Sequence, residues 1–111
     1  MGCNTEKRTT YSKLIRDKIP EIIEGVGKTC KCETLPEEGF IEFLNAKLIE
    51  EVNEYLDSGT LEELADITEV IHAILEHMNV HSEELQRVRL NKRSTHGGFE
   101  KRLLLKEVIE Q

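Results

Sequence analysis

Two stretches of the chain carry apolar residues at the spacing of an amphipathic helix. The first stretch spans residues 36–59 and the second spans residues 60–79. The apolar residues are Phe40, Ile41, Leu44, Leu48, Val52 and Tyr55 in the first stretch and Leu64, Ile67, Val70, Ile71, Ile74, Leu75 and Met78 in the second. Because the connection between the stretches is short, we predict two antiparallel helices whose apolar faces pack together.

The ends of these helices, and of two shorter ones, carry sequence signals. Thr60 and Glu63 have the form of a capping box, which predicts the start of the second long helix. Asp17 as the N-cap and Pro20 in the first turn predict a short helix that ends near residue 24. A further helix is predicted over residues 82–93, after the second long helix.

Two segments outside the helices have features of strands. Residues 28–35 are predicted to form a short strand. Residues 99–109 fit a strand or a helix, and we favour a strand that pairs with residues 28–35. The expected fold is therefore mainly α, an antiparallel helical bundle core with a small strand pair from the terminal segments. Residues 1–10 are polar and expected to be flexible, which leaves residues 11–111 as a single domain.

Composition narrows the range of functions and compartments. The chain has 111 residues and a net charge of -7, which argues against a protein that binds nucleic acid through its phosphates. No apolar run is long enough for a membrane span or a signal peptide. Cys3, Cys30 and Cys32 are odd in number and cannot all pair internally, so we expect reduced thiols in a cytoplasmic protein.

Four acidic residues are the main candidates for chemistry. Glu51 and Glu54 lie three residues apart on the first long helix, as do Glu63 and Asp66 on the second. At about 100° per residue, both pairs fall on the same flank of their apolar stripe. Four carboxylates from adjacent helices repel one another unless a cation neutralises them, and ligation by oxygen alone suits Mg²⁺ or Mn²⁺. The alternative is two solvated helix faces, with Glu63 serving only the capping box.

The chain also resembles a known family in three blocks. Residues 50–54, EEVNE, and residues 63–66, ELAD, resemble the EExxE…ExxD signature of the MazG-like, all-α nucleoside triphosphate pyrophosphohydrolases. That superfamily includes dimeric dUTPases and phosphoribosyl-ATP pyrophosphohydrolases. Residues 11–20 and 97–102 look like the N-terminal and C-terminal blocks of its small single-domain branch, described as predicted house-cleaning hydrolases of noncanonical nucleotides.

The resemblance implies an enzyme and a site. It implies Mg²⁺-dependent hydrolysis of nucleoside triphosphates between the α and β phosphates, giving a nucleoside monophosphate and pyrophosphate, with Mn²⁺ as a substitute cofactor. It also implies a homo-oligomer, a dimer or a tetramer. The family's metal ligands match Glu51, Glu54, Glu63 and Asp66, and Glu50 matches the remaining motif acid, which would orient or activate water. His96 stands where this branch is expected to have Arg, a departure that concerns one phosphate contact.

Basic residues would complete a site for the triphosphate. The candidates are Lys47, Lys92, Arg93, Lys13 and Arg16. Each has an ordinary structural explanation as well. Lys47 fits an ion pair with Glu51 one turn away, Lys92 and Arg93 suit a helix C-terminus, and the other two suit the surface or a subunit contact. The main alternative to an enzyme is an acidic helical module for dimerisation or regulation that performs no catalysis.

Overall fold

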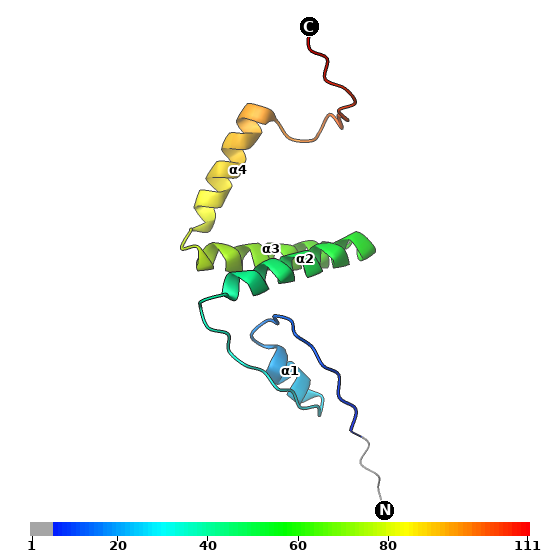
Figure 1. The fold of residues 1–111 in the computed structure, drawn as a ribbon, viewed down its shortest axis with the longest axis vertical. Coiled ribbons are helices and arrows are strands. Elements are labelled where there is room, and N and C mark those ends of the chain that lie inside the picture. Colours follow the sequence, from blue (N-terminus) through cyan, green and yellow to red (C-terminus); the bar gives the residue numbers. More distant parts are fainter. Residues whose placement is uncertain (1–5) are drawn as a thin grey trace, which may run out of the picture.

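The structure, a computed structural model, describes residues 6–111 and contains four helices and no strand within that range (Figure 1). The helices are α1 (Ile19–Gly25), α2 (Phe40–Ser58), α3 (Leu61–His77) and α4 (Ser82–His96). The predicted mainly α class is therefore confirmed, and the described residues are all-α. The prediction of a flexible end for residues 1–5 and of a reduced thiol at Cys3 lies outside the described residues. Cys30 and Cys32 are free thiols.

A helical hairpin of α2 and α3 is the packed centre of the molecule. These two helices run side by side and are the closely packed pair among the described elements (Figure 1). Gly59 takes a positive φ of 64° between them, a conformation that closes α2 and that residues with a Cβ rarely adopt. The Thr60 hydroxyl then accepts a hydrogen bond from the Glu63 backbone N–H at 3.4 Å, which confirms the predicted start of α3.

Other helix boundaries differ from their predictions by a few residues. α2 begins at Phe40, because Gly39 has a φ of 83° and interrupts the helical path that the sequence suggested from residue 36. α1 has Lys18 rather than Asp17 as its N-cap, and Pro20 lies in its first turn as predicted. α4 continues to His96, three residues beyond the predicted end at residue 93.

The predicted strand pair is wrong for the described residues. Residues 28–35 form a loop between α1 and α2, and residues 99–111 leave α4 and extend away from the other elements (Figure 1). Phe99 and Leu103 are 94% and 86% exposed. A strand is stable only where a neighbour satisfies its backbone hydrogen bonds, and the two segments do not meet to provide one.

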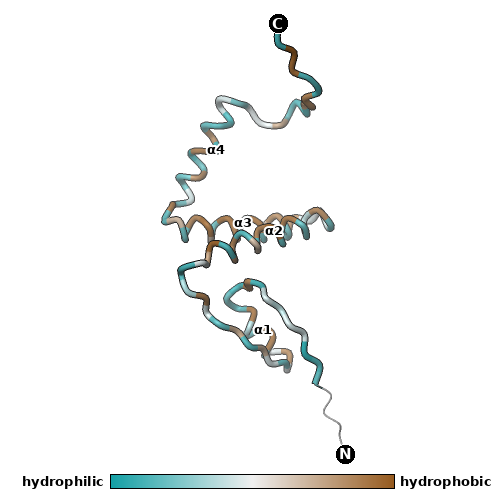
Figure 2. Tube along the Cα trace, in the orientation of Figure 1, coloured by the Kyte–Doolittle hydropathy of each residue, from teal (hydrophilic) through white to brown (hydrophobic). Residues whose placement is uncertain are grey.

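The apolar core of the chain is small. Leu44, Val70 and Leu75 are its buried apolar residues within residues 6–111, and all three lie on the hairpin. The radius of gyration is 20.4 Å, whereas a compact domain of this length has about 13 Å. Much apolar surface therefore remains outside, including the hydrophobic positions of the C-terminal segment (Figure 2). None of the described helices is both long and apolar enough to cross a membrane.

Candidate metal centre

Three carboxylates meet on one side of the helical hairpin. Glu51 comes from α2, and Glu63 and Asp66 come from successive turns of α3. One carboxylate oxygen from each lies within 4.8 Å of the other two. The antiparallel packing of α2 on α3 brings the two halves of the predicted acid set together, as their positions on the flank of each apolar stripe suggested.

Burial distinguishes this group from an ordinary acidic surface. Glu51 is only 6% exposed and is the one buried charged residue that the described part of the chain contains. Within residues 6–111, neither Glu51 Oε2 nor Glu63 Oε2 has a hydrogen-bond partner, although both atoms are buried. A buried carboxylate oxygen without a partner destabilises the folded state, because folding removes its hydrogen bonds to water and provides no hydrogen bond in their place. Both oxygens are therefore suited to a cation bound between the helices.

Glu54, the fourth predicted ligand, is not part of the three-acid group. It is exposed on α2, one turn beyond Glu51. Burial raises the pKa of the Glu51 carboxyl above its ordinary value, and the negative charges of Glu54 and Asp66 raise that pKa further, against the opposing effect of Lys47. Glu54 thus lies near enough to act on Glu51 electrostatically.

Lys47 links the two neighbouring acids of α2. Its Nζ lies 3.2 Å from Glu51 Oε1 and 3.3 Å from Glu50 Oε1. Burial acts to lower the pKa of Lys47, but its bonds to Glu51 and Glu50 outweigh that effect and raise the pKa above its ordinary value. The ion pair between Lys47 and Glu51 is the one that the spacing of four residues suggested.

Two cations reach the acids from the N-terminal arm, which we define as residues 11–18. Arg16 Nη2 donates to Asp66 Oδ1 at 2.7 Å, and Lys13 Nζ lies 3.6 Å from Glu50 Oε1. The sequence predicted both residues as candidates for substrate binding but did not predict their acidic partners. Arg16 and Asp66 are 50 positions apart, so neither helical periodicity nor local spacing could pair them.

Lys92 and Arg93 are not brought to the acids within this chain. Both lie in the second half of α4, which departs from the hairpin (Figure 1). Arg93 instead forms an ion pair with Glu100, just beyond the end of its helix. This position fits the alternative that basic residues near the C-terminus of a helix complement its dipole.

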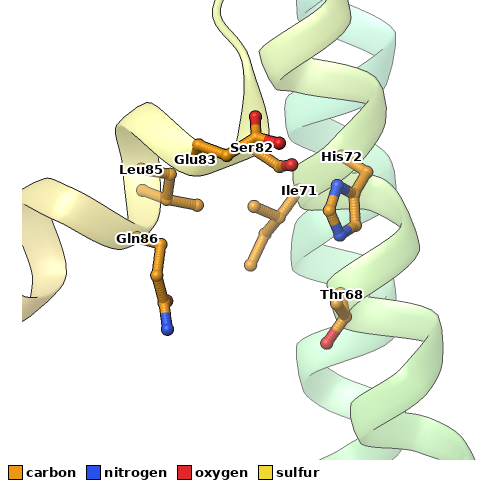
Figure 3. Close-up of a pocket in the computed structure, with 7 residues that line it drawn as sticks. All are labelled: Thr68, Ile71, His72, Ser82, Glu83, Leu85 and Gln86. Atoms are coloured by element: carbon orange, nitrogen blue, oxygen red, sulfur yellow. The ribbon is translucent and has the colours of Figure 1, made fainter.

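A hollow between α3 and α4 lies apart from the acid group. It has a volume of about 450 Å³ and is lined by Thr68, Ile71, His72, Ser82, Glu83, Leu85 and Gln86 (Figure 3). None of the three convergent carboxylates contributes to its walls. Leu85 of α4 and Ile71 of α3 face each other across the hollow (Figure 3). Its lining contains a single acid and one imidazole, so the hollow lacks the clustered oxygen donors of the hairpin.

Comparisons of the chain with models of known protein families, with curated proteins and with solved structures find no match. The donor atoms of the site themselves indicate which ion it could bind. These are carboxylate oxygens without sulfur or imidazole, a set that favours hard divalent cations such as Mg²⁺ and Mn²⁺ over Zn²⁺.

The buried charge of Glu51 predicts how stability depends on pH. The pKa of Glu51 is raised above its ordinary 4.5, so ionisation opposes folding and the penalty grows as the pH rises from that value through the folded pKa. Glu51→Gln removes this penalty while its amide oxygen can still accept from Lys47. Without divalent cations, the variant should melt a few degrees higher than the parent chain near pH 7 and about equally near pH 4.

Thermal unfolding in EDTA at the two pH values measures this difference. The matched control is Glu69→Gln, which neutralises an exposed acid of α3 outside the group. It should show no comparable gain near pH 7. A Glu51→Gln variant that melts lower than the parent chain at both pH values contradicts a repulsive carboxylate group.

Proposed function

We propose that this chain hydrolyses nucleoside triphosphates, noncanonical ones in particular, between the α and β phosphates to a nucleoside monophosphate and pyrophosphate. We place this activity in the cytoplasm, where Cys30 and Cys32 stay reduced. The observation that carries the proposal is the meeting of Glu51, Glu63 and Asp66. Glu51 and Glu63 each hold a buried oxygen that has no hydrogen-bond partner in the described part of the chain. The resemblance of residues 50–54 and 63–66 to a pyrophosphohydrolase signature assigns the same acids to a metal.

The donor set fits Mg²⁺, with Mn²⁺ as a substitute. Glu51, Glu63 and Asp66 would hold the cation between α2 and α3. Glu54, exposed one turn beyond Glu51, would serve as the fourth ligand once a cation draws it in. When bound, a divalent cation supplies polarisation of the phosphates and lowers the pKa of a water molecule.

Glu50 is the residue we assign to proton transfer. Lys47 and Lys13 both contact its Oε1 atom, at 3.3 Å and 3.6 Å. This arrangement fixes the orientation of the carboxylate and leaves Oε2 as the oxygen that accepts a proton from the attacking water. Lys47 is itself held by Glu51, so the base and one metal ligand share a single positioning cation.

The phosphates of the substrate require cations close to the acids. Lys13 and Arg16 meet this requirement within the chain, because the N-terminal arm already holds them against Glu50 and Asp66. Lys92 and Arg93 meet it only if α4 of another copy approaches the hairpin. A homo-oligomer, a dimer or a tetramer, would provide that approach.

The exposed apolar surface also supports a homo-oligomer. Apolar side chains that the described structure leaves more than two-fifths exposed occur on α3 and at its C-cap, on α4 and along the C-terminal segment; they include Leu64, Met78, Leu85, Val88, Leu90, Leu104 and Ile109. The three buried apolar residues among residues 6–111 form a small core for an independent domain of this length. Burial of part of this surface against a second copy would supply the missing hydrophobic stabilisation.

Light scattering coupled to size exclusion tests the oligomer. At micromolar concentration the chain should elute with the mass of a dimer or a tetramer. Because the proposed contact is apolar, raising the salt concentration should not dissociate it. A monomer that retains full hydrolytic activity refutes the oligomer while leaving the metal site intact.

A second candidate function rests on the same exposed apolar surface. A helical dimerisation module without catalysis would also expose apolar faces as a single chain. It would need no divalent cation, and its acids would serve solubility alone. An oligomer that hydrolyses no nucleoside triphosphate in the presence of Mg²⁺ would favour this function.

Glu63→Gln tests the proposed enzyme. The capping bond uses the Glu63 backbone N–H, so the substitution keeps the start of α3 and removes one carboxylate charge from the group. Pyrophosphate release from a panel of canonical and modified nucleoside triphosphates should fall about a hundredfold or more. The parent chain should lose its activity in EDTA and regain it with Mg²⁺ or Mn²⁺.

The matched control is Glu62→Gln. Glu62 is the exposed neighbouring acid of α3 and lies outside the three-acid group. Its variant should retain nearly all activity. Equal losses in the two variants, or activity that EDTA leaves unchanged, would show that the acid group is not the centre of the reaction.

A further inference from the structure

The N-terminal arm contacts both helices of the hairpin through two cationic side chains. Lys13 contacts Glu50 of α2, and Arg16 contacts Asp66 of α3. Lys13 also stacks its ammonium over the ring of Tyr11, at 5.3 Å from the centroid. The arm thus places one positive charge beside Asp66, which we assign to the metal, and another beside Glu50, which we assign to proton transfer.

The three cations beside the acids differ in how easily they can leave. Lys47 lies on the same helix as its partners, and its side chain is only 14% exposed. Arg16 belongs to a segment without regular structure that precedes α1, and its side chain is 54% exposed. An exposed ion pair contributes little to stability, so the bond between Arg16 and Asp66 breaks at low cost.

Arg16 and a divalent cation would compete for the negative charge of the Asp66 carboxylate. Asp66 gives one oxygen to the Arg16 guanidinium at 2.7 Å and is also a member of the three-acid group. A guanidinium and a divalent cation on one carboxylate repel each other at short range. The buried Oε2 of Glu51, without a hydrogen-bond partner among the described residues, shows that the arm does not satisfy the whole group.

We infer that Arg16 is the resting counter-ion of the metal site: it neutralises Asp66 until a divalent cation takes its place, and it then binds the phosphates of the incoming nucleotide. This inference rests on the proposed function and adds an exchange at the same site. Without metal, the Arg16 guanidinium reduces the electrostatic repulsion among the three carboxylates. It also releases a cation for the triphosphate at the moment when the metal is bound.

The exchange has a thermodynamic consequence with a defined sign. If the arm and the metal compete, removal of the arm's charge strengthens metal binding, because linkage between two competing ligands is reciprocal. The same removal weakens nucleotide binding, because the phosphates lose a cationic partner. If Arg16 merely held the arm in place, its replacement would weaken metal binding or leave it unchanged.

The experiment is a titration of Mn²⁺ into the full chain without nucleotide, followed by electron paramagnetic resonance. Arg16→Gln should bind Mn²⁺ about two- to fivefold more tightly than the parent chain, the range expected for loss of one exposed ion pair. It should also raise the KM for the nucleoside triphosphate. Arg16→Lys, which keeps the charge, should bind Mn²⁺ nearly as the parent does.

Arg8→Gln is the matched control. Arg8 precedes the arm and pairs with Glu6, so its removal deletes one positive charge without touching the acid group. Its variant should bind Mn²⁺ as the parent chain does. An equal increase in Mn²⁺ affinity in Arg8→Gln and Arg16→Gln would show that the effect arises from net charge alone, and this would overturn the exchange.

A second measurement uses the parent chain and needs no folded variant. In a ¹⁵N-labelled sample, the Nε–Hε signal of Arg16 should move as Mg²⁺ saturates the acids, while that of Arg8 stays in place. An unmoved Arg16 signal, or unchanged or weaker Mn²⁺ binding in Arg16→Gln, overturns the exchange and leaves the metal site standing. A parent chain that binds no divalent cation removes the metal site and the exchange together.

Discussion

The buried carboxylate of Glu51 is the constraint on which the arrangement around the hairpin depends. It lies between α2 and α3, beside the half-buried side chains of Glu63 and Asp66. Charge of one sign at this density opposes the packing of the two helices unless a cation compensates it. Lys47 compensates part of it from within α2, and Arg16 compensates part from the N-terminal arm. Two buried oxygens, of Glu51 and Glu63, have no hydrogen-bond partner among residues 6–111, and in the proposed site they would be left to a divalent cation.

The sequence predicted the hairpin and its acids because both depend on short-range geometry. The spacing of apolar residues in α2 and α3 follows the helical period, and Gly59 with Thr60 marks the turn between them. Acids three residues apart on the flank of each stripe are then expected to approach one another when the stripes pack. Glu51, Glu63 and Asp66 do so, while Glu54 remains at the exposed edge of the group.

The remaining features depend on contacts between distant segments, which a local pattern does not contain. The partner of Arg16 lies 50 positions away, and nothing near either residue identifies the other. Residues 99–111 have apolar residues that suit a strand, but no strand lies beside them in the described part of the chain, and their apolar side chains stay exposed. The same lack of a neighbour leaves Lys92 and Arg93 away from the acids. In the proposed homo-oligomer, a second copy would lie against the C-terminal segment and α4.

Anomalous diffraction from a crystal grown with Mn²⁺ tests the central claim most directly, because it locates the cation without relying on activity. Our account places a manganese peak between α2 and α3, within coordination distance of carboxylate oxygens from Glu51, Glu63 and Asp66. Manganese found only at other surface carboxylates, with these three acids in contact with protein cations alone, would contradict it.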